Sequence, residues 1–178
     1  MNDLNIMLAG FGGQGILFAG KVLAYSGLLD GREVSWIPSY GPEMRGGTAY
    51  CSVRIASEAI GSPLVTEPDV LVAFNKPALD NFIDQVKPGG LVLFDSSTIT
   101  AEVNRTDIDY VGIEANKLAE DNALQGLANV IMIGKLLQLT DFSTMEQVKK
   151  AIDKSVSSRH MDLLEHNKEA LALGFSQD

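Results

Sequence analysis

VLVAFNKPALDNFIDQVKPGGLVLF, at residues 70–94, is the most informative stretch of the chain for its architecture. Two uninterrupted apolar runs, 70–74 and 91–94, flank a segment that begins with Asn75, a good helix N-cap, and has Pro77 in its first turn. A Lys-Pro-Gly-Gly sequence then breaks this helix after about residue 86. Parallel strands are buried on both faces and are therefore apolar throughout, so the stretch predicts a strand–helix–strand unit of a parallel sheet.

The rest of the chain extends this sheet. Residues 5–9 form an apolar run before a glycine-rich turn, and a helix is expected at 15–29. A strand is expected at 34–37, ended by Pro38, and the alternation at 48–55 is typical of an antiparallel or edge strand. The remaining expected elements are a strand at 109–113 and helices at 114–122, 128–139, 144–157 and 161–173. The prediction is α/β: a Rossmann-like open, mostly parallel sheet with flanking helices, in a single domain of residues 1–178.

Composition limits the class of protein. The 178 residues are 46% hydrophobic and 21% charged, which excludes a disordered or fibrous chain. With 23 acidic against 14 basic side chains the net charge is -9, which disfavours nucleic acid and membrane surfaces as partners. The single cysteine, Cys51, cannot hold an iron-sulfur cluster or a structural zinc ion, which take about four ligands. With no basic leader and no apolar run of about 18 residues, we expect a cytoplasmic protein.

The first candidate site is the glycine-rich turn at 10–15, GFGGQG. Its residues Gly10, Gly12, Gly13, Gln14 and Gly15 fit the G-x-G-x-x-G pattern between a strand and a helix, where backbone N–H groups can meet a phosphate. A dinucleotide site would also need an acidic residue at the end of the second strand, which the sequence lacks there. Three interpretations remain open: a dinucleotide site, an anion or coenzyme contact, and a turn that only lets helix and strand pack closely.

The second candidate is the loop SYGPEMRGG at 39–47. It combines an aromatic, an acid and a base with three glycines, which suits unusual backbone angles and the presentation of polar groups. The candidate residues are Tyr40, Gly41, Glu43, Arg45, Gly46 and Gly47. The alternative is a structural turn in which Glu43 and Arg45 form an exposed ion pair of little energetic weight.

Strand direction brings the candidates together. If the strands are parallel, the glycine-rich turn, the loop at 40–47, residues 75–76 and residues 95–97 all lie at the carboxyl edge of the sheet, where such folds bind ligands. Elsewhere, Cys51 is expected to be a buried inert thiol, Trp36 to be a core residue, and His160 and His166 to be solvated. No catalytic residues and no metal ligands are predicted.

The two glycine-rich segments together make the chain resemble the gamma subunit of 2-oxoacid:ferredoxin oxidoreductases. The shared motifs are AGFGGQG at 9–15, AG at 19–20, IPSYGPEMRGGTA at 37–49, SP at 62–63, PDVLVA at 68–73, KPGG at 87–90, AN at 128–129 and Gly134. Residues 114–125 match the family poorly. The form SYGPEMRGG is more similar to the 2-oxoglutarate and branched-chain (ketoisovalerate) members than to the pyruvate members.

The resemblance implies a non-autonomous subunit that is inactive alone. The complex would decarboxylate a 2-oxoacid oxidatively, with 2-oxoglutarate expected, to form an acyl-CoA and reduce ferredoxin. Thiamine diphosphate, magnesium and iron-sulfur clusters would reside on partner subunits, which are alpha and beta chains and a small ferredoxin-like chain. The two candidate segments would contact coenzyme A (CoA) or a neighbouring chain beside that active site. Because ferredoxins are acidic, the net charge of -9 predicts that ferredoxin docks elsewhere in the complex. The alternative is a free-standing coenzyme- or nucleotide-binding regulatory module.

Overall fold

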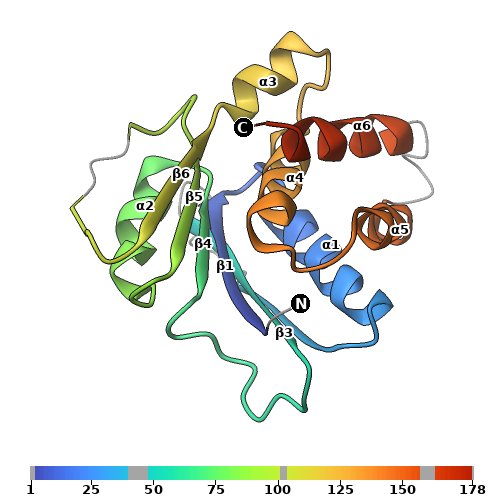
Figure 1. Ribbon diagram of the computed structural model, residues 1–178. Helices are drawn as coiled ribbons and strands as arrows, with labels where there is room; N and C mark the ends of the chain where they lie inside the picture. The colour runs from blue at the N-terminus through green and yellow to red at the C-terminus, as the bar shows by residue number, and fades with distance from the viewer. Residues whose placement is uncertain (1–2, 40–47, 101–103, 157–162, 178) are drawn as a thin grey trace.

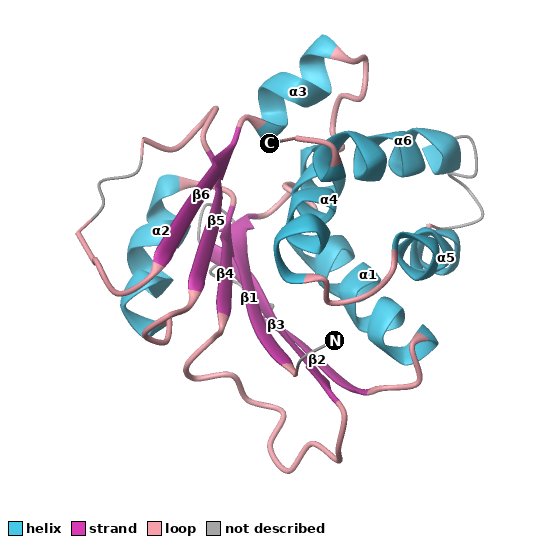
Figure 2. Ribbon diagram, viewed as in Figure 1, coloured by secondary structure: helices cyan, strands magenta, loops and turns pink. Residues whose placement is uncertain are grey.

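The computed structural model describes residues 3–39, 48–100, 104–156 and 163–177. Within these residues, six strands form one sheet in the order β2-β3-β1-β4-β5-β6 (Figure 2). The strands are β1 (Leu4–Phe11), β2 (Glu33–Ser39), β3 (Thr48–Ala56), β4 (Val70–Ala73), β5 (Leu91–Asp95) and β6 (Asp109–Ile113).

The sheet is mixed. Strand β1 pairs in parallel with β4, β4 with β5, and β5 with β6. Strand β3 is antiparallel to both β1 and β2, so β2 points the same way as β1. The α/β prediction is confirmed, and so is the antiparallel character expected for residues 48–55. Five of the six strands therefore end at the same edge of the sheet, which is also where β3 begins.

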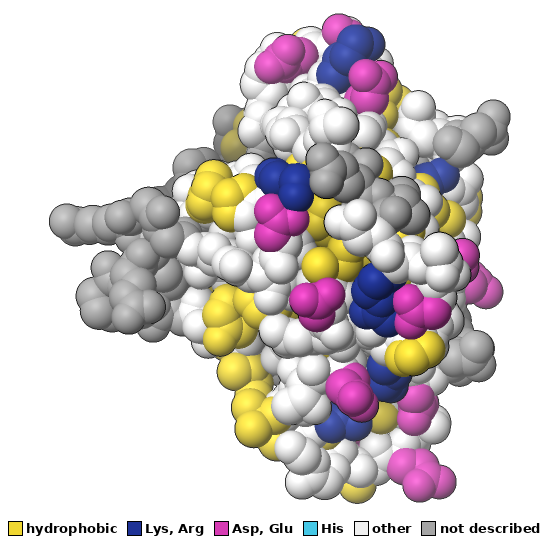
Figure 3. All heavy atoms as spheres, turned by 90° about the vertical axis from the view of Figure 1, so that its left-hand side faces the viewer, with side chains coloured by type: hydrophobic (Ala, Val, Ile, Leu, Met, Phe, Trp, Pro, Cys, Tyr) yellow, Lys and Arg dark blue, Asp and Glu magenta, His cyan; other side chains and the backbone are white. Residues whose placement is uncertain are grey.

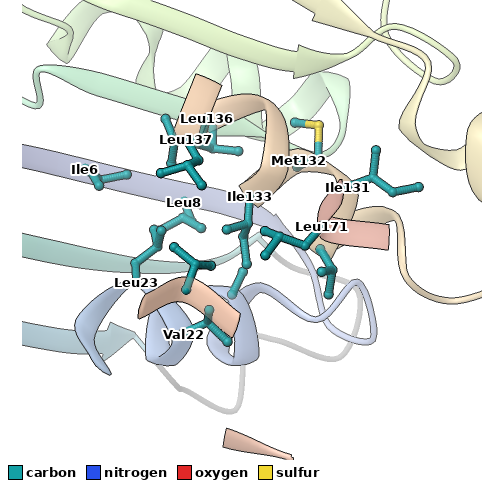
Figure 4. Packing of buried hydrophobic residues seen from close by; sticks show 14 of the residues in the cluster. Ile6, Leu8, Val22, Leu23, Ile131, Met132, Ile133, Leu136, Leu137 and Leu171 are labelled. Atoms are coloured by element: carbon teal, nitrogen blue, oxygen red, sulfur yellow. The ribbon is translucent and has the colours of Figure 1, made fainter. Parts of the chain in front are cut away.

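Helices cover the two faces unequally (Figure 1). One face carries α1 (Ile16–Leu29), α4 (Ala128–Thr140), α5 (Met145–Ser155) and α6 (Leu164–Phe175), and the other carries α2 (Lys76–Phe82), while α3 (Ala115–Asp121) follows the edge strand β6. Each face of the sheet has its own hydrophobic core, and alternate residues of β1 belong to one or the other. Ile6 and Leu8 pack toward α1 and α4, and Met7 and Ala9 pack toward α2. Figure 4 shows Ile6 and Leu8 among side chains of α1, α4 and α6.

Helices α4 and α6 pack backbone to backbone. A Cβ on Gly134 would lie 2.1 Å from the carbonyl oxygen of Leu171, and one on Gly174 would lie 1.9 Å from that of Ile131. No larger residue fits at either position without separating the helices. Helix α4 also packs against α1, α3 and the sheet, so it is covered on nearly all sides, which explains why it is mostly apolar and buried.

Several element boundaries differ from prediction. Pro38 lies inside β2 and does not end it. Strand β2 is at the edge of the sheet, where proline, which has no backbone N–H, can point its nitrogen away from the neighbouring strand without losing a hydrogen bond between strands. The helix expected up to residue 86 ends at Phe82 and continues as a short 3-10 turn, Ile83–Gln85. The prediction that Trp36 is a core residue was wrong, since 36% of its surface is exposed on the same edge strand. The last helix begins at Leu164 and reaches Phe175, beyond the expected limit of 173.

Candidate functional site

The glycine-rich turn joins β1 to α1 at the carboxyl edge of the sheet. Gly13 and Gly15 have φ of +95° and +73°, in the left-handed region that favours glycine. Gly10 is still in β1, where a Cβ would lie 2.6 Å from the Gln14 Oε1 atom and 2.9 Å from the Phe74 Cβ atom. Gly12 and Gly13 are exposed. Backbone geometry and crowding therefore explain Gly10, Gly13 and Gly15, and Gly12 is exposed at the surface of the turn.

Gln14 fastens this turn to the neighbouring strand. Its Oε1 atom accepts hydrogen bonds from the Phe11 N–H at 2.7 Å and from the Asn75 Nδ2 at 2.9 Å. Its Nε2 atom donates to the Phe74 carbonyl oxygen at 3.1 Å. Asn75 in turn accepts from the Ala78 N–H and so caps α2, as predicted. The side chain of Gln14 is therefore a structural link between the turn, the end of β4 and the start of α2.

Asn129 holds the other side of the turn. Its Nδ2 atom donates to the Gly15 carbonyl oxygen at 3.2 Å, across 114 residues of sequence. A Cβ on Gly15 would lie only 2.3 Å from that Nδ2 atom. Asn129 was missed as a site residue, because nothing local in the sequence shows which backbone group its amide meets. Its place in the AN motif at 128–129 was the only signal.

The start of α1 is open to an anion. Gly15 is its N-cap residue, no side chain caps it, and its first turn has no acidic residue. Helix α4 also begins without a side-chain cap or an acidic residue in its first turn, and the Asn129–Gly15 bond places its start beside that of α1. The first N–H groups of a helix lack intrahelical partners and carry partial positive charge. Two such ends meet beside the exposed glycines, which is a suitable environment for a phosphate or carboxylate.

The second candidate, Tyr40, Gly41, Glu43, Arg45, Gly46 and Gly47, lies outside the described residues. The residues on either side of it, Ser39 and Thr48, are placed at the carboxyl edge. Thr48 pairs with Phe11 of β1, so the chain re-enters the sheet next to the glycine-rich turn, whereas Ser39 lies at the same edge but one strand further out. The predicted proximity is thus confirmed for Thr48, at one end of this loop. Phe11 itself is 38% exposed, an aromatic at the rim that was not singled out from the sequence.

Residues 95–97 also lie at this edge, but Asp95 is occupied structurally. Its carboxylate is 1% exposed and accepts hydrogen bonds from the Ala115 N–H, the Asn116 N–H and the Asn116 side chain at the start of α3. It also accepts from the backbone and hydroxyl of Ser97. A carboxylate with this many donors joins β5 to α3, and it is not free to act as a base.

Of the other residues singled out from the sequence, Cys51 and His166 are placed as expected. Cys51 is fully buried, its Sγ atom lies 3.6 Å from the Ile16 carbonyl oxygen, and burial raises the pKa of its thiol to about 12. His166 is exposed, and His160 lies outside the described residues. In the part of the chain that the structure describes, no three His, Cys, Asp or Glu residues are grouped to hold a metal ion. None of the helices described there is long and apolar enough to cross a bilayer.

These features define an α/β protein with an uncapped glycine-rich turn at the carboxyl edge of a mixed sheet. The family model for pyruvate ferredoxin/flavodoxin oxidoreductase matches residues 5–177, and the chain belongs to that family.

Named relatives agree with this assignment. The chain is 44% identical over 138 residues to the ketoisovalerate oxidoreductase subunit VorA of Methanothermobacter marburgensis, covering 77% of this chain and 28% of that subunit. It is 40% identical over 154 residues to the 2-oxoglutarate synthase subunit KorC of Methanocaldococcus jannaschii, covering 85% of this chain and 82% of KorC. The chain therefore spans less than a third of the length of VorA but corresponds to most of KorC.

Solved structures share the fold. The gamma subunit of keto/oxoacid ferredoxin oxidoreductase from Geobacter sulfurreducens superposes with a TM-score of 0.82 at 28% identity, covering 97% of this chain and 96% of that one. The 2-oxoglutarate:ferredoxin oxidoreductase of Magnetococcus marinus, with 2-oxoglutarate, coenzyme A and succinyl-CoA bound, superposes with a TM-score of 0.88 at 26% identity. That match covers 99% of this chain and 31% of the other, so a unit of this shape also occurs inside a longer polypeptide.

Proposed function

We propose that this chain is the gamma-type subunit of a 2-oxoacid:ferredoxin oxidoreductase and contributes the glycine-rich turn to the binding of coenzyme A. The complex would convert a 2-oxoacid and CoA to acyl-CoA and carbon dioxide, with two electrons passing to ferredoxin. Family membership supports the reaction class. The bound coenzyme A in the Magnetococcus marinus relative supports the choice of ligand.

The observation that carries the proposal is the pair of helix starts without a side-chain cap, α1 after Gly15 and α4 after Leu127. Coenzyme A bears phosphates, and helix N-termini with no acidic residue in the first turn favour such groups. Gln14 and Asn129 hold the turn from two sides, so its N–H groups are oriented before a ligand arrives. Preorganised donors bind an anion more tightly than mobile ones, because less ordering accompanies binding.

The loop at 40–47 would complete this site. Tyr40, Glu43 and Arg45 would order the edge that faces the partner subunits, and Arg45 would form a bidentate contact with a carboxylate or phosphate. The glycines of the loop would let its backbone approach the ligand closely. The pairing of Phe11 with Thr48 supports a shared site, because it fixes one end of the loop beside the turn.

Alpha and beta chains, with a small ferredoxin-like chain, are the proposed partners. They would hold thiamine diphosphate, magnesium and the iron-sulfur clusters, and thiamine diphosphate would supply the decarboxylation chemistry. The only cysteine of this chain, Cys51, is buried against α1, which suits a chain whose clusters lie elsewhere. On the side that carries α2, basic side chains are interspersed with acidic ones (Figure 3), so that side lacks the uniform positive charge an acidic ferredoxin would favour.

We propose 2-oxoglutarate as the substrate. The KorC relatives support this choice, because they match this chain along most of their length. The VorA relatives make 3-methyl-2-oxobutanoate (ketoisovalerate) the competing substrate. The substrate-binding residues would lie on the partner chains, so the substrate must be identified with the assembled complex.

The first experiment is purification of the chain from its own cells under anaerobic conditions. We expect larger partner chains, iron and thiamine diphosphate to co-purify, together with CoA-dependent dye reduction that is fastest with 2-oxoglutarate. Pyruvate and 3-methyl-2-oxobutanoate serve as comparison substrates. A lone chain that binds a nucleotide and ignores 2-oxoacids would support a regulatory module instead.

Two variants of that complex test the site. Gly13→Asp adds a carboxylate to the exposed turn, where φ is +95° and nothing lies within 4 Å of a new Cβ, and Gly31→Asp adds the same charge at another open position with a positive φ, +72°. We expect Gly13→Asp to raise the KM for CoA about tenfold or more and to leave the KM for the 2-oxoacid unchanged, and Gly31→Asp to change neither. Arg45→Lys keeps the charge but loses the bidentate fork. Unchanged assembly, turnover and CoA affinity in that variant would contradict the role given to Arg45.

A further inference from the structure

Helix α1 is apolar on its outer face as well as on its inner one. Its sequence, ILFAGKVLAYSGLL, contains a single charged residue, Lys21. The neighbouring helix α5, MEQVKKAIDKS, is by contrast a typical surface helix, with a buried apolar face and charged residues on its other sides. A helix that is apolar all round is normally covered on all sides. The outer face of α1 therefore has the composition of a covered surface.

The residues of this outer face form a stripe along the helix. Leu17, Lys21, Tyr25 and Leu28 are 4, 4 and 3 residues apart, and none of them is among the buried residues of α1. Leu28 is 55% exposed. The Lys21 Nζ atom lies over the ring of Tyr25, 5.7 Å from its centroid. We call these four residues, together with Trp36 of β2, the α1 stripe.

Trp36 extends the stripe to the edge of the sheet. Its Nε1 atom lies 2.9 Å from the position that a Cβ on Gly20 would take, so the indole ring packs against α1. Leu17 is one helical turn before Gly20, which places it beside this contact. The ring is nevertheless 36% exposed, because β2 is the outermost strand on this side of the sheet (Figure 2). Tyrosine and tryptophan, both present in the stripe, are enriched where protein chains meet.

The charge of the α1 stripe is opposite in sign to that of the whole chain. The chain has a net charge of -9, but the stripe contains one lysine and no acidic residue. None of the ion pairs among the described residues includes Lys21. The stripe therefore fits an apolar surface that presents one carboxylate. A second copy of this chain fits less well, because a two-fold contact between identical stripes would bring two Lys21 side chains together.

We propose that the α1 stripe is the surface by which this chain docks onto a larger chain of its complex, with a carboxylate of that chain opposite Lys21. The proposal rests on the function proposed above. In the Magnetococcus marinus relative and in VorA, the matching unit is 31% and 28% of a longer polypeptide, so there it is joined to a larger partner. Helix α1 begins at the glycine-rich turn, so a chain docked on the stripe would also border the proposed coenzyme site.

Acetylation of amines in the purified complex tests whether the stripe is covered. Lys21 is only half-buried by its own chain, and Lys154 of α5 is exposed. We expect Lys21 to react at least tenfold more slowly than Lys154, once each rate is divided by the rate of the same residue in urea-unfolded protein. Carbodiimide cross-linking should in addition join the Lys21 amine to a carboxylate of the larger chain, in a peptide pair that mass spectrometry identifies.

Matched variants test whether the stripe holds the two chains together. Leu28→Glu places a charge in the stripe at a position exposed enough to leave the fold intact, and Leu139→Glu is its control, at a 38% exposed leucine of α4 outside the stripe. We expect Leu28→Glu to weaken association with the larger chain at least tenfold when the complex is diluted, and Leu139→Glu to weaken it less than threefold. Lys21→Glu should weaken it as well, whereas Lys21→Arg should not. Thermal denaturation confirms that each variant is folded.

The outcomes separate this proposal from the proposed function. Equal acetylation of Lys21 and Lys154 in a complex that contains the larger chain would overturn the docking surface and leave the function standing. Unchanged association of Leu28→Glu, or equal losses for Leu28→Glu and Leu139→Glu, would do the same. A cross-link from Lys21 to another copy of this chain would assign the stripe to self-association. A parent chain that purifies without a larger chain would overturn both proposals.

Discussion

Replacing Gly15 by alanine measures how firmly the glycine-rich turn is held. Gly15 has a φ of +73°, and a left-handed conformation costs a non-glycine residue about 1–2 kcal/mol. The new Cβ would also lie 2.3 Å from Asn129 Nδ2, and overpacking a buried contact costs about 1–3 kcal/mol. Asn129 is buried and cannot swing into solvent. We therefore expect the free energy of unfolding to fall by about 2–5 kcal/mol.

Gly13→Ala is the matched control for this change. Gly13 also has a positive φ, +95°, but nothing lies within 4 Å of a Cβ placed there. Only the backbone contribution should appear, a loss of about 1–2 kcal/mol. Urea denaturation followed by circular dichroism gives both values, with equal denaturant slopes showing that the unfolded states are comparable.

A double-mutant cycle then isolates the contact between the two residues. Asn129→Ala removes the side chain that the new Cβ would strike, so in that background Gly15→Ala should cost only the backbone contribution of about 1–2 kcal/mol. Equal losses for Gly13→Ala and Gly15→Ala, or an undiminished loss in the Asn129→Ala background, would refute the reasoning that Asn129 braces the turn.

Three further changes probe the rest of the fold. Gly134→Ala should lower the free energy of unfolding by about 3 kcal/mol or more in thermal melts, because its Cβ meets the backbone of Leu171, whereas Gly61→Ala in open space should change it by less than about 0.5 kcal/mol. Asp95→Ala should cost about 2–4 kcal/mol and speed hydrogen exchange of the first amides of α3, since it removes their acceptor. Cys51 should resist thiol reagents in the folded chain and react on unfolding. The pKa of its thiol is about 12 in the folded chain and 9.0 ordinarily, so the folded state holds the thiol proton more tightly than the unfolded state does. The thiol's contribution to stability is fully present below pH 9 and is lost as the pH rises toward 12. In alkaline urea titrations, the free energy of unfolding of the wild type should therefore fall relative to that of Cys51→Ala by up to about 1.4 kcal/mol per pH unit.

The strands could be predicted from the sequence because burial leaves a direct pattern. The apolar runs of β4 and β5 and the alternation in β3 follow from the number of faces that each strand buries. Pro38 and Trp36 were misplaced for one shared reason. Each was judged by its residue type, whereas the edge position of β2 decides both the tolerance of proline and the exposure of tryptophan.

The candidate site was less accessible to such reasoning. The spacing of the glycines, which is a local signal, located the turn. The direction of the strands, which follows from their parallel pairing, located the edge of the sheet. The two side chains that hold the turn in place, Gln14 and Asn129, could not be found in this way. Gln14 reaches Phe74 and Asn75 across about 60 residues, and Asn129 reaches Gly15 across 114, so both contacts exist only once the chain is folded. An amide side chain carries no sequence signal for its partner.

The antiparallel strand β3 explains how the glycine-rich turn and the two residues that flank the loop at 40–47, Ser39 and Thr48, come to share one edge. In an all-parallel arrangement, a chain that leaves β2 at the carboxyl edge must cross to the opposite edge before the next strand begins. Here β3 begins at the carboxyl edge, with Thr48 opposite Phe11, so the chain re-enters the sheet beside the glycine-rich turn, and Ser39, where β2 ends, lies one strand further out at the same edge. The same reversal places Cys51 against the start of α1, where its Sγ atom meets the Ile16 carbonyl oxygen. The departure from parallel order therefore places Thr48, where β3 begins, next to the glycine-rich turn, and the proposed shared site depends on this placement.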